Sequence, residues 1–144
     1  MQTIDLAKEE LKRVDHLFYV SLKYTRTCDV IRNIIKRLIS SYDYAISAIL
    51  EHYESEGKIS SIPPSEKIRA ELVLKLRRKD REFIGHYLLL RKIIDADFER
   101  KSEYRKHVTL IAKFDEDYEV DVIKVMEYFK KTDEYVRLIG EFLE

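Results

Sequence analysis

The sequence predicts an all-α fold, an antiparallel bundle of four long helices that forms one domain over residues 1–144. Only three Gly and two Pro interrupt the 144 residues, so few turns are expected. The chain makes heavy use of Leu, Ile, Lys, Glu and Arg, which favour helix over sheet. Apolar residues recur every three or four positions in four long segments, and helices patterned in this way bury their apolar stripes as a bundle.

The first helix is expected from Thr3, a suitable N-cap residue, to Tyr24. Its apolar positions lie three to four residues apart, as on one face of a helix: Ala7, Leu11, Val14, Phe18 and Leu22. This segment therefore supplies one amphipathic element of the bundle.

The second helix is expected to begin after Thr27 or Asp29, either of which would cap it, and to end near Glu54. Its apolar residues come in adjacent pairs, beginning with Val30/Ile31 and Ile34/Ile35. A stripe this wide suits a central helix that contacts two or three others. Because neither Pro nor Gly separates the first two helices, the sequence leaves open that they form one bent rod.

Gly57 predicts a left-handed cap after the second helix, and Pro63 and Pro64 suit the start of a third. That third helix is expected over residues 64–95, with a charged middle, residues 75–82, that protrudes past the bundle. A last helix is expected over residues 121–142. Between residues 99 and 120 the sequence leaves open a short helix or a small hairpin made of residues 108–114 and 118–122.

Basic and acidic residues balance at 27 each, so the formal net charge is zero. This excludes a generally polybasic nucleic-acid binder but not a local basic patch. Residues 65–107 carry thirteen basic and eight acidic residues, whereas residues 115–144 carry four and ten. The asymmetry would orient a partner, or would bring two segments together within the fold or between subunits.

Cys28 is the only cysteine, so no internal disulfide forms and no oxidising compartment is needed. The N-terminal residues lack an apolar signal core, and no run approaches the roughly 18 apolar residues of a membrane span. A cytoplasmic protein without a membrane partner is expected. Gln2 and Asn33 are the only side-chain amides, which together with the many charges is a thermophile-like usage.

Signatures of common cofactor and metal sites are absent, including the phosphate-binding Gly-rich loop and paired Cys motifs. No cofactor and no metal are therefore expected. A weaker hypothesis is a metal site in which Glu103 and His107 approach Glu82 and His86, since each pair lies four residues apart.

The candidate catalytic residues are Arg81 and His86. Five residues on a helix place their side chains about 140° apart, so the two would meet most easily in a cleft between subunits. There His86 would exchange a proton with an RNA 2′-hydroxyl or leaving oxygen, and Arg81 would stabilise charge on the phosphate. The alternative is a surface arginine and an incidental histidine.

The candidate nucleic-acid-binding residues form two basic groups that could contact phosphates: Arg77, Arg78 and Lys79, then Arg105 and Lys106. Their alternative use is as solvated helix faces. The ten tyrosines are expected mainly at core edges and interfaces, and a homodimer through an apolar or tyrosine-lined helix face is predicted.

Three segments resemble the HEPN superfamily of small helical domains. Residues 41–57, SYDYAISAILEHYESEG, are similar to its central Tyr/Ala-rich helix that ends in Gly. Residues 90–98, LRKIIDADF, are similar to the Arg…Ala-Asp-Tyr element that ends the third helix in some members. Arg81 and His86 match the Arg-x4-His form of the motif of its ribonuclease members.

The resemblance implies a helical module associated with RNA or nucleotides. If it is catalytic, it implies a metal-independent ribonuclease with His86 as general acid/base and Arg81 on the phosphate. The alternative, which the non-catalytic members imply, is a helical interaction or scaffold module that binds a partner protein.

Overall fold

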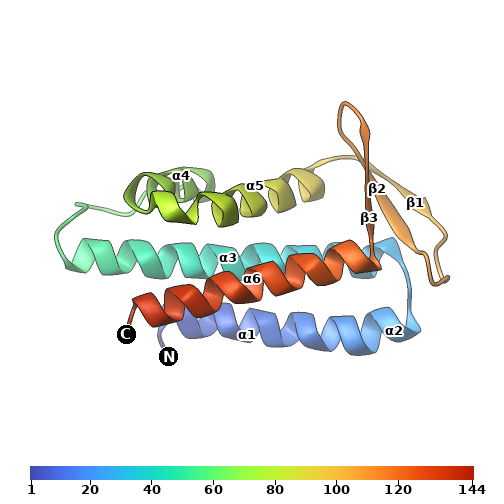
Figure 1. Cartoon of the computed structure of the whole chain (residues 1–144), viewed down its shortest axis with the longest axis horizontal. Helices are drawn as coiled ribbons and strands as arrows, with labels where there is room; N and C mark the ends of the chain where they lie inside the picture. Colours follow the sequence, from blue (N-terminus) through green and yellow to red (C-terminus); the bar gives the residue numbers. More distant parts are fainter.

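The computed structural model describes all of residues 1–144 and consists of long helices with a small sheet at one end (Figure 1). The elements in chain order are α1 (Thr3–His16), a π-helical segment (Leu17–Ser21), α2 (Leu22–Tyr24), α3 (Cys28–Ser55), α4 (Glu66–Leu76), a 3₁₀ turn (Arg78–Asp80), α5 (Arg81–Asp95), β1 (Phe98–Lys101), β2 (Thr109–Lys113), β3 (Asp117–Asp121) and α6 (Val122–Phe142). The prediction of an all-α bundle of four long helices is therefore wrong, because the chain combines helices with a three-stranded sheet.

Helix α3 is the centre of the helical part. It contacts α1, α4, α5 and α6, and its residues are buried along most of its length (Figure 1). The paired apolar positions explain this, because residues such as Ile34 and Ile35, about 100° apart around the helix, are both fully buried. The prediction of a central helix is confirmed.

The first two helices are separate antiparallel elements and not one bent rod (Figure 1). Thr27 is the N-cap of α3, and its side chain accepts a hydrogen bond from the Val30 amide at 3.3 Å. At the other end of α3, Gly57 has a φ of 75°, which confirms the predicted left-handed cap. α1 begins at Thr3 as expected, but its N-cap residue is Gln2.

The predicted third helix is broken in two, because the chain leaves the helix at Arg77 (φ −138°, ψ 74°) and turns into the core. The Arg77 guanidinium donates to Asp80 at 2.7 Å and lies 4.1 Å from the centre of the Phe142 ring. The Tyr135 hydroxyl also donates to Asp80, at 2.9 Å. The charged middle of this segment is therefore a corner with a buried ion pair, and not a protruding helix.

Strands β1, β2 and β3 pair antiparallel in that order. β2 and β3 correspond to the hairpin that the sequence left open, with Leu110 opposite Val120. β1 was not predicted, because Phe98–Lys101 show no alternation of apolar and polar positions. In the structure most of its residues are exposed. Its strand conformation follows from pairing with β2.

The sheet and the helices share one core. Leu110, Ala112 and Val120 belong to the same cluster of buried side chains as the residues of α1, α3, α5 and α6. No helix combines the length and the apolar character that crossing a membrane requires.

Replacing Asp80 by Ala should lower the free energy of unfolding by about 3–5 kcal/mol, because it leaves the buried Arg77 guanidinium without its carboxylate. Urea denaturation of the wild type and the variant measures the difference. The matched control is Asp133→Ala, which removes an exposed ion pair with Arg137 and should change stability by about 0.5 kcal/mol or less. Equal effects of the two substitutions would show that the buried pair does not stabilise the corner.

Candidate nucleic-acid interface

His86 lies in the core between α5, α3 and α6, and only 8% of its surface is exposed. Its Nδ1 is hydrogen-bonded to the Tyr42 hydroxyl at 2.7 Å, and its ring lies 5.2 Å from that of Tyr128. Its Nε2 is buried and has no hydrogen-bond partner. Burial, with a smaller contribution from Lys131, lowers the pKa of His86 to about 4, so the ring is neutral at pH 7.

Arg81 is exposed at the start of α5 and does not meet His86 in one cleft of the chain. Their separation around the helix puts one side chain in solvent and the other in the core. The two side chains therefore do not converge within one chain, and the catalytic pair across two subunits stays a prediction. Glu82, next to Arg81, forms an ion pair with Lys131 at 2.9 Å.

The predicted nucleic-acid-binding residues divide into three cases. Arg77 is buried and paired with Asp80, so it is not available to phosphate, and this prediction is wrong. Arg78 and Lys79 are exposed at the α4–α5 corner. Arg105 and Lys106 are exposed in the loop between β1 and β2, at the other end of the molecule (Figure 1).

A groove lies at the sheet end of the molecule, where three segments far apart in the sequence meet. The end of the first helical segment, the β1–β2 loop and the start of α6 enclose about 390 Å³. We call this the hairpin-end groove, and it is lined by Phe18, Tyr19, Leu22, Lys23, Arg26, Lys106, His107, Thr109, Asp121, Val122 and Ile123. Its volume is typical of small-molecule and cofactor sites.

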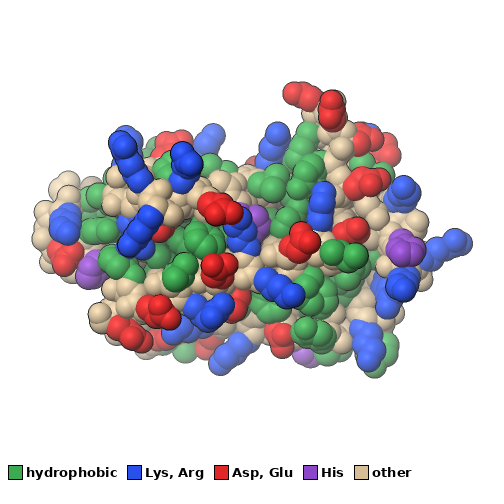
Figure 2. All heavy atoms as spheres, in the orientation of Figure 1, with side chains coloured by type: hydrophobic (Ala, Val, Ile, Leu, Met, Phe, Trp, Pro, Cys, Tyr) green, Lys and Arg blue, Asp and Glu red, His purple; other side chains and the backbone are tan.

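The groove has an apolar floor and a cationic rim. Lys23, Arg26 and Lys106 make no ion pair with any carboxylate of the chain, and neither does the neighbouring Arg105. The one acidic lining residue, Asp121, is the N-cap of α6 and accepts from an amide of that helix at 2.9 Å. Figure 2 shows Lys and Arg side chains gathered at this end around a hydrophobic area. The groove therefore suits an anionic ligand with apolar or aromatic parts.

The π-helical segment shapes one wall of the groove. Four apolar or aromatic residues in a row, residues 17–20, cannot all face the core of a regular helix, and here the helix widens. Tyr19 stays 57% exposed while Phe18 is partly buried, and both line the groove. π segments of this kind are often found at functional sites. The run of consecutive apolar residues was the available sequence signal for this wall.

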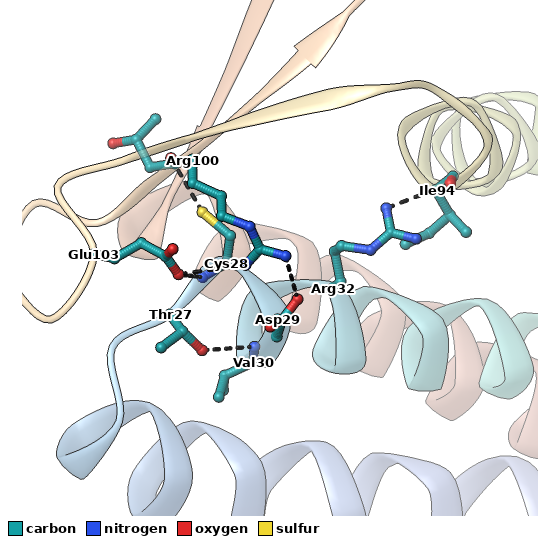
Figure 3. A network of polar contacts seen from close by, with 9 residues as sticks. Thr27, Cys28, Asp29, Val30, Arg32, Ile94, Arg100 and Glu103 are labelled. Carbon is teal, nitrogen blue, oxygen red and sulfur yellow. Dashed lines mark hydrogen bonds and ion pairs between the residues drawn. The ribbon is translucent and has the colours of Figure 1, made fainter.

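The β1–β2 loop forms the opposite wall and is anchored on the N-terminus of α3 (Figure 3). The Glu103 carboxylate accepts from the Cys28 amide at 3.0 Å, so residue 103 caps a helix that begins 75 residues earlier. Arg100 bridges Asp29 at 2.9 Å and Glu103 at 3.5 Å. The Cys28 thiol donates to the Thr109 carbonyl, and burial raises its pKa, which fits a structural role.

This anchoring holds two residues of the loop in the left-handed region, Ser102 (φ 57°) and Tyr104 (φ 65°). For a bulky residue such as Tyr104 that conformation is unfavourable and persists only where surrounding contacts impose it. The Tyr104 amide donates to the Arg26 carbonyl at 2.6 Å, and 76% of the residue is exposed. The loop therefore presents an aromatic side chain to solvent beside the groove, at a conformational cost.

The arrangement offers no metal site. No three His, Cys, Asp or Glu side chains come close enough to hold an ion. The weaker metal hypothesis is therefore not supported, because Glu103 caps α3 and Glu82 pairs with Lys131. What the groove offers chemically is charge neutralisation, apolar contact and aromatic stacking.

Comparisons of the chain with protein-family models, with curated proteins and with solved structures gave no match. The geometry of the hairpin-end groove, together with the sequence patterns, is therefore the basis for the function proposed below.

Acidification should destabilise the protein through His86. Its pKa is depressed on folding, so the stability it contributes is present above pH 6.5 and is lost as the pH falls through about 4. The loss is on the order of 3 kcal/mol. Asp43 acts in the opposite direction, because burial raises its pKa to about 6 and its stabilising effect grows as the pH falls.

The variant His86→Leu separates the two effects. Urea denaturation at pH 7 and pH 4 should show the wild type losing on the order of 3 kcal/mol relative to the variant. A difference between the two proteins that does not change with pH would show that His86 is not held neutral by burial.

Replacing Glu103 by Ala should leave the Cys28 amide of α3 without its carboxylate acceptor, while the Thr27 cap stays in place, and lower the free energy of unfolding by about 1 kcal/mol. It should also release the loop, so that hydrogen exchange at the Cys28 and Tyr104 amides becomes faster. Glu116→Ala, an exposed residue of the β2–β3 turn, is the control and should change neither measurement. Unchanged exchange in Glu103→Ala would mean that the loop is held by other contacts.

Proposed function

We propose that the protein is a HEPN-like, RNA-associated module that binds single-stranded RNA in the hairpin-end groove without cleaving it. The observation that carries this proposal is the combination of unpaired cations and exposed tyrosines around an apolar floor. The sequence resemblance of residues 41–57 and 90–98 to HEPN domains gives a separate reason to consider RNA.

The groove has the two features that single-stranded nucleic acid requires. Lys23, Arg26 and Lys106 would neutralise successive phosphates. Tyr19, at 57% exposure, lines the groove, and Tyr104, at 76%, lies on the adjoining loop; bases would stack on both rings. Because stacking tolerates every base, we expect weak sequence preference.

A single strand is favoured over a duplex. The unpaired cations of the groove form a short patch, not an extended basic surface of the kind that follows a duplex backbone. Unpaired bases, in contrast, are free to leave their neighbours and enter an apolar groove. The groove is therefore matched to a short unpaired segment.

The absence of cleavage is proposed from the placement of the predicted catalytic pair. His86 is buried with Tyr42, and Arg81 is exposed elsewhere, so within one chain the two do not reach one phosphate. General acid–base catalysis requires the base to lie within hydrogen-bond reach of the reacting proton.

The homodimer and a partner protein remain predictions. Light scattering after gel filtration gives the mass in solution, and the chain of 17.3 kDa would appear at twice that mass as a dimer. If the partner is a protein, the cations of the groove would favour an acidic segment. An acidic peptide is therefore included as a second ligand in the binding experiment.

Binding of a short labelled RNA should weaken about tenfold or more in Arg26→Ala/Lys106→Ala. The slope of log K against log salt should fall by about 1.4, because two phosphate contacts are lost. Tyr19→Ala should cost about 1–3 kcal/mol of binding if a base stacks on it. Fluorescence anisotropy across a salt series measures all three quantities.

The control is Lys12→Ala/Lys130→Ala, which removes the same charge from exposed positions outside the groove and should leave binding within about twofold. Tighter binding of an acidic peptide than of RNA would overturn the RNA proposal in favour of the protein-partner alternative. Cleavage of the RNA by the wild type would contradict the binding-only function, and cleavage that persists in His86→Ala would direct attention to His107 in the groove.

A further inference from the structure

A second hollow lies at the corner between α4 and α5, away from the hairpin-end groove. It encloses about 710 Å³ and is lined by Leu74, Lys75, Arg78, Lys79, Arg81 and Glu82. Figure 1 places this corner at the opposite end of the molecule from the sheet, and Figure 2 shows Lys and Arg side chains gathered there.

Four cations of this corner have no partner in the chain. Lys75, Arg78, Lys79 and Arg81 make no ion pair within 4.0 Å. The one carboxylate of the hollow, Glu82, is bound by Lys131 of α6, and that hydrogen bond lowers its pKa. Like charges held this close repel one another, and an anion between them removes the repulsion.

The corner is held in place by buried side chains on its core side. Arg77 and Asp80, the residues on either side of Arg78 and Lys79, are both buried and bonded to each other. Asp80 also accepts from Tyr135 of α6. The backbone of the turn is therefore fixed by the core, and Arg78 and Lys79 leave it at adjacent exposed positions. A preorganised cluster binds an anion without first ordering the turn.

The composition of the hollow decides between ligand classes. Leu74 is its only hydrophobic lining residue, and no aromatic side chain is present for a base to stack on. The six residues carry four positive charges and one negative, a net of +3. A single phosphate carries about −1.5 to −2 charges at pH 7, so it would leave part of this charge unmatched.

We propose that this corner is a binding site for a polyphosphate chain, as in pyrophosphate, tripolyphosphate or the phosphate tail of a nucleoside triphosphate. The cations contact the phosphate oxygens, and any attached nucleoside stays in solvent. The site is separate from the RNA groove and does not depend on the proposed RNA function.

Isothermal titration calorimetry with tripolyphosphate tests the proposal, with pyrophosphate, phosphate and sulfate as comparison ligands. Tripolyphosphate should bind at least tenfold more tightly than phosphate or sulfate. Lys75→Ala/Lys79→Ala should weaken it at least tenfold. Lys12→Ala/Lys130→Ala, which has the same change in net charge outside the hollow, should weaken it by no more than about twofold. Unchanged melting temperatures and circular dichroism establish that both variants are folded.

Equal weakening by the two double variants would overturn the proposal, because the effect would then be one of net charge alone. Equal affinity for sulfate and tripolyphosphate would also overturn it. Loss of RNA binding in Lys75→Ala/Lys79→Ala without loss of tripolyphosphate binding would assign the corner to RNA instead. Adenosine triphosphate that binds no more tightly than tripolyphosphate would support recognition of the phosphate chain alone.

Discussion

The burial of α3 on several sides is the constraint on which the rest of the structure depends. Thirteen of its 28 residues are buried, so no single neighbouring helix can cover it. α1 and α6 cover part of its surface, and α4 and α5 cover the remainder. At its N-terminal end the β1–β2 loop supplies a further contact, from the Glu103 carboxylate to the Cys28 amide. The hairpin-end groove exists because three segments converge on that one end.

The core is unusually rich in tyrosine, and each buried hydroxyl needs a partner. Tyr42 is bonded to His86, Tyr135 to Asp80 and Tyr87 to Asp43, so the polar groups form cross-links between α3, α5, α6 and the corner. Buried hydroxyls that are paired in this way favour one packing of the helices over others, and the one buried side-chain atom left without a partner is His86 Nε2. Residue 86 thus supplies the hydrogen-bond partner of the Tyr42 hydroxyl.

Elements with a strong helical period could be predicted from the sequence, as α1, α3 and α6 show. Their limits follow from local signals such as Thr27 and Gly57. The corner at residues 77–80 could not, because an Arg and an Asp three residues apart are equally compatible with an exposed ion pair on a continuous helix. Tyr135 and Phe142, which contact Asp80 and Arg77 from α6, are brought to this corner only by the tertiary structure.

The candidate site, too, was only partly predictable from the sequence. The basic character of residues 105 and 106 was visible in the sequence, whereas Lys23, Arg26 and Tyr19 gave no separate signal because they lie in an amphipathic helix and its short linker. Their grouping depends on Glu103 meeting the first amide of α3, a contact between distant parts of the chain. The β1 strand, whose pairing depends on β2, could not be recognised alone.

The π-helical segment has a consequence for how the sequence tolerates changes in length. A π turn accommodates one more residue than an α turn, so residues 17–21 act as a one-residue insertion absorbed within a helix. Deleting one residue there would let the helix close regularly, and residues 22–24 would keep nearly the same orientation relative to α1, because the deletion removes only the absorbed insertion. Leu22, which is 3% exposed, would then stay in the core, and the change would fall on the groove wall formed by Phe18 and Tyr19. The extra residue thus shapes the groove wall and leaves the packing of the flanking helix unchanged.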